Sequence, residues 1–230
     1  TSGDLDVRGS GQIINVVLFE ELSSTSFSYQ GSLNYSQDDA IQPGGTFAVS
    51  GQRGELNYTM TLRSQPRYRN SLNNESSILG DFSPNDTVTE EVTIDGANNE
   101  LSFNLAYAIN SKSTLQLNGL LAERDAPTDI ERVTSNLRSN PVVHLVEREA
   151  NPNPRDNWEG GFDYEYTFDN GARFKLLGIA NQDENLRIRQ RFERFANNTE
   201  ELNLILNSNS ITKERIVRGS YTFDFLQNQS

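Results

Sequence analysis

The chain has 230 residues, a net charge of -12 at pH 7 and no cysteine. The acidic balance argues against nucleic acid as a partner, because such a surface needs clustered Lys and Arg, and the lack of cysteine excludes disulfides and thiolate metal sites. Only 34% of the residues are hydrophobic, which is poor for a globule with a large core and suits a sheet that is wet on one face.

The first predicted element lies within RGSGQIINVVLFEE, residues 8–21. Gly9 and Gly11 precede a run over 13–19 that is apolar on both faces except at Asn15. Such a run predicts a strand that is buried on both sides. No apolar stretch of the chain is long enough to predict a transmembrane helix.

From residue 26 onward, apolar and polar residues alternate. Successive side chains of a strand point to opposite faces, so this alternation predicts strands with one apolar and one polar face. We expect about eight of them, at 26–35, 46–50, 55–63, 100–110, 113–121, 157–169, 172–195 and 213–225. Several are long enough to cross a bilayer at a tilt.

The predicted connections alternate in length. Tight turns are expected at 52–54, 110–113 and 169–171, and long polar loops at 64–99, 124–156 and 196–212, with a shorter connection at 37–45. An up-and-down sheet then has its tight turns at one end and its long loops at the other. Outer-membrane barrels sort their connections in this way, with short periplasmic turns and long extracellular loops.

The loop over 124–156 contains signals of its own. Thr128 and Glu131 fit a capping box, and Ile130, Val133 and Leu137 follow at helical spacing, which predicts a short helix at 129–138. Residues 140–147 could form a strand that extends beyond the membrane or folds back into a lumen. His144, the one histidine, is expected to be an ordinary loop residue, because it has no second metal ligand or nucleophile nearby.

The sequence therefore predicts an all-β fold: an antiparallel up-and-down meander of about eight strands that is part of a transmembrane β-barrel. Within hydrocarbon every peptide group must be paired, so a spanning sheet has to close on itself. The outward side chains would contact lipid and the inward ones a wet lumen. Aromatic residues near the strand ends would form interfacial girdles; they are Tyr107, Phe168, Tyr221 and Phe225.

This organisation resembles that of TonB-dependent outer-membrane receptors. The segment over 8–21 resembles the last strand of that family's plug domain, and DAIQPGGTFAVSGQRGELNYTMTLRSQPRYR, residues 39–69, resembles its first loop to third barrel strand. The resemblance implies the end of a plug at 1–22 and the first part of a barrel of 22 strands at 23–230. The family's TonB box and most of its plug would lie upstream of Thr1.

What the resemblance implies about function is active uptake of a scarce, bulky solute across a bacterial outer membrane. The solute would be of the siderophore, cobalamin or oligosaccharide class, and an inner-membrane energy-transducing complex would act on the plug. Neither a cofactor nor a resident metal is expected. The partners would be the lipid bilayer, that complex and the small-molecule solute.

Three arginines are the candidate solute-facing residues. Arg187, Arg189 and Arg191 alternate along one strand, so all three should point into the lumen, where they could attract an anionic ligand. The alternative is that they pair with the acidic lumen residues Asp163 and Glu165 of the preceding strand.

Two other functions remain open on the sequence. A complete small outer-membrane barrel, acting as an adhesin, structural protein or narrow pore, requires the first and last strands to pair. A soluble carbohydrate-binding β-sandwich requires a second sheet over the apolar face. An enzyme is not expected, because no nucleophile–base pair or carboxylate pair stands out from the alternation.

Overall fold

The computed structural model describes residues 23–36 and 38–223, and the regular structure of this part is β-strand throughout. The predicted plug segment at 1–22 and the predicted aromatic end at Phe225 lie outside the described residues. The strands are β1 (Ser24–Tyr35), β2 (Ile41–Arg53), β3 (Leu56–Ile78), β4 (Pro84–Asn110), β5 (Ser113–Asp125), β6 (Thr128–Asn136), β7 (Val143–Asn151), β8 (Arg155–Thr167), β9 (Arg173–Arg194) and β10 (Glu200–Thr222).

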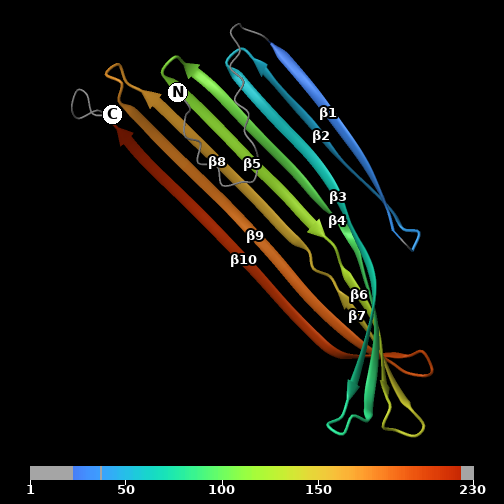
Figure 1. Cartoon of the computed structure of the whole chain (residues 1–230). Helices are drawn as coiled ribbons and strands as arrows, with labels where there is room; N and C mark the ends of the chain where they lie inside the picture. The colour runs from blue at the N-terminus through green and yellow to red at the C-terminus, as the bar shows by residue number, and fades with distance from the viewer. Residues whose placement is uncertain (1–22, 37, 224–230) are drawn as a thin grey trace.

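All ten strands belong to one antiparallel sheet, which confirms the predicted all-β meander. Among the described residues, β1 pairs only with β2 and β10 only with β9, so these two strands are the edges. The sheet is a long, twisted ribbon in which the turns β2–β3, β4–β5 and β8–β9 share one end (Figure 1). The hairpins β3–β4, β6–β7 and β9–β10 reach to the other end.

β5 and β6 together form one long strand that proline interrupts, and β7 and β8 form another. β5 and β6 follow one another along β4, which pairs with β5 over 97–110 and with β6 over 86–94. Pro127 separates β5 from β6, and Pro152 and Pro154 separate β7 from β8. Proline has no N–H to give to the ladder, so the regular pairing is interrupted at these points, although the carbonyl oxygens of all three prolines still accept from β4 or β9. With the interrupted pairs joined, the meander has the eight strands that the alternation predicts.

The prediction of three long polar loops is wrong. Residues 64–99 are mostly the paired halves of β3 and β4, residues 124–156 hold β6 and β7, and β10 begins at Glu200. The shorter connection at 37–45 is also too long, because β2 begins at Ile41. Alternation fails to detect these segments because both of their faces are polar. Their composition still favours strand, as in the run of Thr and Val at 87–89.

The helix predicted at 129–138 is wrong as well. Residues 128–136 form β6, which pairs with β4 on one side and with β7 on the other. An isolated helix of this length is marginal in water, and the β-branched residues Ile130, Val133 and Thr134 fit a paired strand better. Residues 143–151 are β7, so the strand expected within 140–147 is confirmed from Val143 onward, and His144 lies in this strand rather than in a loop.

Candidate functional site

The pairing registers give the sheet two chemically different faces. One register row joins Leu62, Leu101, Leu121 and Trp158 across β3, β4, β5 and β8. The rows on the side of the tight turns continue the same face; they contain Tyr58, Met60, Phe103, Leu105, Tyr107, Leu115, Leu117, Phe162, Tyr164 and Leu176. We call this surface the apolar belt.

The apolar belt is exposed rather than covered. Leu121 is 57% exposed, Phe103 40% and Trp158 40%, and at β1 and β2 the belt continues with Tyr29 at 79%. The described strands form a single sheet, so no second layer lies over these side chains within 23–36 and 38–223. The β-sandwich alternative expects such a layer.

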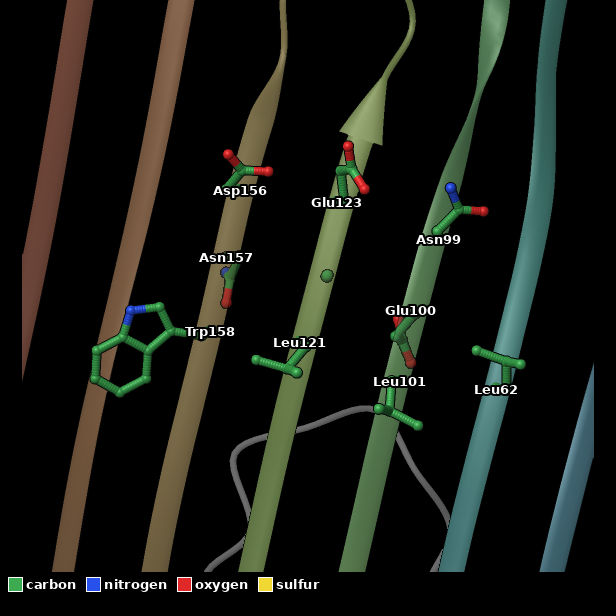
Figure 2. A pocket seen from close by; sticks show the side chains of 10 residues that line it. Leu62, Asn99, Glu100, Leu101, Leu121, Glu123, Asp156, Asn157 and Trp158 are labelled. Atoms are coloured by element: carbon green, nitrogen blue, oxygen red, sulfur yellow. The ribbon is translucent and has the colours of Figure 1, made fainter.

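The belt ends in a row of polar side chains. Figure 2 shows Asn99, Glu123 and Asp156 lying side by side on β4, β5 and β8, next to Leu101, Leu121 and Trp158. Glu184 of β9 continues the polar row as the partner of Asp156. A shallow, open hollow of about 370 Å³ lies across this boundary. On this face, the side chains therefore change from apolar to polar or charged between two neighbouring register rows.

Aromatic residues mark the opposite limit of the belt, near the tight turns. The rings of Tyr166 and Phe168 are 4.8 Å apart, Phe168 and Tyr221 are 5.7 Å apart, and Tyr221 and Phe223 are 5.7 Å apart. Two of the four predicted girdle residues, Phe168 and Tyr221, are therefore in contact. The belt is weakest at β9 and β10, where Gln182 and Lys213 continue the row of Trp158 and Arg215 stands on the same face one row further in, opposite Ala180.

The second face of the sheet, the polar face, carries charged and amide side chains opposite the belt. Lys175 pairs with Asp163 at 2.8 Å, and Arg155 pairs with Asp183 at 2.7 Å. The register also places Glu159 and Glu165 here, on the same side of β8 as Asp163. From β3 to β8 the alternation thus sorts most apolar and polar residues onto opposite faces, while on β9 the apolar Leu177 and Ile179 lie on the polar face.

The candidate residues Arg187, Arg189 and Arg191 share the polar face of β9, beyond the level of the belt. The prediction that these arginines pair with Asp163 and Glu165 is wrong, because they bind other carboxylates. Arg189 instead binds Glu149 of β7, with Nη2–Oε1 and Nε–Oε2 distances of 2.6 and 2.8 Å. Arg191 lies 3.3 Å from Glu147 of β7 and donates to Asn203 at 3.1 Å. The hairpin β6–β7 supplies these carboxylates, and the sequence alone does not place it there.

Glu149 is the centre of an ion-pair network on this face. Its carboxylate is 1% exposed and accepts from both Arg189 and Arg132, the second at 3.1 Å. Arg132 also binds Glu90 of β4 at 2.6 Å and Glu147 at 3.4 Å. Hydrogen bonds from Arg189, then from Arg132, hold the pKa of Glu149 at about 2. The network ties β4, β6, β7 and β9 together where few apolar contacts exist.

The sequence analysis missed this network, although a signal for it is present. Glu147 and Glu149 are two residues apart, as strand neighbours on one face must be, and Arg132 stands in a segment taken for a helix. A strand over 143–151 brings both carboxylates onto one face, and the long-range pairing of β7 with β9 then aligns them with the arginines.

A second ion-pair cluster lies on the opposite face of the same hairpins. Glu200 of β10 accepts from Arg148 at 2.9 Å and from Arg194 at 3.0 Å, and Arg194 also binds Glu131. The guanidinium of Arg148 is 4.5 Å from the centre of the Phe192 ring. Both faces of the extension beyond the belt are thus held by charges rather than by a core.

The described residues contain no group of three His, Asp or Glu side chains that could hold a metal ion. His144 instead bonds Ser135 across β6–β7, with an Oγ–Nδ1 distance of 2.9 Å. No helix in this part of the chain is long and apolar enough to span a membrane.

Comparisons of the chain with protein-family models, with curated proteins and with solved structures find no match. Function is therefore argued from the two faces of the sheet and the clusters on them.

We expect Glu149→Gln to loosen the hairpin β6–β7 without unfolding the belt. Neutralising the buried carboxylate leaves Arg132 and Arg189 without their shared partner, which costs about 2 kcal/mol after allowance for the partial exposure of Arg189. Because the folded pKa is depressed, the stabilisation is present above the ordinary carboxyl pKa and is lost as pH falls towards 2. Amide hydrogen exchange over 128–151 measures the loss.

The matched control for this variant is Glu200→Gln, which removes a more exposed carboxylate on the opposite face of the extension. Its effect on exchange over 128–151 should be smaller. Equal protection in wild type and Glu149→Gln would show that the network does not hold the hairpin.

Proposed function

We propose that this sheet is part of the wall of a transmembrane β-barrel in a bacterial outer membrane, with the apolar belt against lipid. The observation that carries the proposal is the belt itself. Large apolar side chains such as Leu62, Leu121 and Trp158 are 40–57% exposed on one continuous face. Monomeric soluble proteins rarely expose a contiguous apolar surface that spans several strands.

The dimensions of the belt support lipid as its partner. Along β8 and the residue after it, the belt runs from Trp158 to Phe168, which is eleven residues (158 to 168). Along β4 it runs from Leu101 to Ile109, which is nine residues (101 to 109). A transmembrane strand needs about 9–11 residues at its usual tilt. The belt therefore has the height of a bilayer core.

The two limits of the belt also support this environment. Aromatic residues stand at both: Tyr166, Phe168 and Tyr221 near the tight turns, and Trp158 beside the polar row. Interfacial aromatic girdles border the apolar band of outer-membrane barrels. The two charged residues of β10 on this face are Lys213 in the last belt row and Arg215 one row further in, and both have side chains long enough to reach the headgroup level.

The polar face would line the lumen, and the extension of β3–β4, β6–β7 and β9–β10 would stand outside the cell. A barrel keeps its short turns in the periplasm and its long connections outside. In this chain, the long connections are ion-paired hairpins rather than irregular loops. The proposal requires the edges β1 and β10 to be paired in the membrane, because hydrocarbon offers no partner to a free peptide group.

Within this framework, the more specific proposal is a TonB-dependent receptor that takes up a scarce, bulky solute. What supports it is the resemblance of residues 8–21 and 39–69 to that family, together with a polar face rich in large charged side chains, which suits a wide lumen. A complete small barrel would pair its first and last strands, and β1 and β10 are not paired with each other in the described part.

The proposal that the sheet is a barrel wall is tested by two separate substitutions at neighbouring residues of β5. Leu117→Arg places a charge at the middle of the belt and should destabilise the membrane-inserted protein by about 2–4 kcal/mol. Gln116→Arg places the same charge on the polar face opposite Asp163 and should be tolerated. Unfolding by urea from lipid vesicles measures both. In a water-soluble protein both exposed positions would accept arginine equally, and that result would refute the lipid-facing belt.

The receptor role is tested by uptake in the native bacterium. Deleting the gene should abolish energy-dependent accumulation of one member of a panel that contains ferric chelates, cobalamin and oligosaccharides. Collapse of the proton gradient across the inner membrane should have the same effect in wild type. Accumulation that persists without the gradient would favour a passive pore.

A further inference from the structure

Three arginines gather on the polar face at the level where the apolar belt ends. Arg124 and Arg155 are direct register partners on β5 and β8. Arg67 stands on the same face of β3, and its partner on β4 is Gly96, against which the backbone of Asp125 and Ala126 packs. Arg67 lies two strands from Arg124 and two residues further along, so at about 4.8 Å between strands and 3.3 Å per residue the two backbones are about 12 Å apart, within reach of two extended guanidinium groups.

The positive charge of this cluster exceeds the negative charge bound to it. Asp183 pairs with Arg155 at 2.7 Å, and no ion pair is found for Arg67 or Arg124 among the described residues. Burial lowers the pKa of Arg124, and the charges of Arg67 and Arg155 lower it further. The chain has a net charge of -12. Three neighbouring arginines with only one carboxylate bound to them therefore repel one another, which costs folding free energy.

The side chain of Arg124 also has an unused hydrogen-bond donor. Its Nε is shielded from solvent and has no partner within the described chain, and the same is true of the side-chain oxygen of Asn98, its register partner on β4. Because the Asn98 oxygen is an acceptor and the Arg124 Nε a donor on neighbouring strands, these two atoms can satisfy each other, and the place for an anion is at the remaining guanidinium nitrogens of the cluster.

We propose that Arg67, Arg124 and Arg155 form an oxyanion-binding site, and that the solute bound at the polar face carries carboxylate or phosphate groups. Guanidinium binds both groups through paired, charge-assisted hydrogen bonds. The inference rests on the proposed function, because it takes the polar face as the lumen and the end of the belt as its outer mouth. Arg189 and Arg191 do not share this role, since Glu149 and Glu147 already neutralise them.

The test is a calorimetric titration of the full chain in lipid vesicles with citrate and, separately, with pyrophosphate. The two probes distinguish a carboxylate from a phosphate preference. Wild type should bind at least one of them, and Arg124→Gln or Arg67→Gln should weaken binding about tenfold or more. The matched control is Arg218→Gln, which removes the same charge from the polar face at the far end of β10, opposite Leu177.

A second measurement separates binding from a structural role. Arg124→Gln relieves the repulsion with Arg67 and Arg155, so the melting temperature should stay the same or rise, while the bound anion should raise it only in wild type. A fall in melting temperature with unchanged anion affinity would make Arg124 a structural residue.

Absence of binding by both anions would overturn the site, as would equal weakening in Arg218→Gln, which would indicate a general effect of charge. The membrane wall is judged independently by the substitutions at Leu117 and Gln116. A lipid-facing belt without anion binding would therefore remove this inference alone, and failure of the belt would remove the proposed function.

Discussion

The whole arrangement depends on the strict two-residue period of side chains along a paired strand. From β1 to β8 the registers set apolar residues or glycine opposite apolar ones over the belt, so Tyr29, Leu62, Leu121 and Trp158 share a face although they are far apart in sequence. A slip of one residue in any pairing would turn that strand's apolar side chains to the polar face. The belt therefore depends on every pairing register of the sheet, and the tight turns preserve those registers.

Beyond the belt, ion pairs rather than apolar contacts hold the sheet together. The extension has polar side chains on both faces, so the sequence of β6 and β7 offers few apolar contacts to fix their place between β4 and β9. Ion pairs with well-aligned hydrogen bonds do so instead, around the buried Glu149 on one face and the more exposed Glu200 on the other. Such pairs contribute less to stability than to the choice of one arrangement, which suits hairpins that must project into water.

The belt could be predicted from the sequence because its two faces differ. Leu115 and Leu117 alternate with Gln116 and Asn118, and an apolar face opposite a polar face is a contrast that hydropathy detects. The extension could not, because strands that are wet on both faces have no such contrast. The helical spacing of Ile130 and Val133, after an apparent capping box at Thr128, then predicts a helix that the structure does not contain. The partners of Arg189 and Arg191 were missed for the same reason, since they belong to a hairpin that only long-range pairing reveals.

The central claim is that lipid surrounds the apolar belt, and Trp158, the one tryptophan of the chain, reports on it most directly. Its ring lies at the edge of the belt next to the polar row (Figure 2). In vesicles of brominated lipid, its fluorescence should be quenched, and more strongly by bromine near the headgroup end of the acyl chain than by bromine near its middle. An indole moved to the polar face by Trp158→Phe with Glu159→Trp should escape quenching. Emission from Trp158 that brominated lipid leaves unchanged would contradict the account.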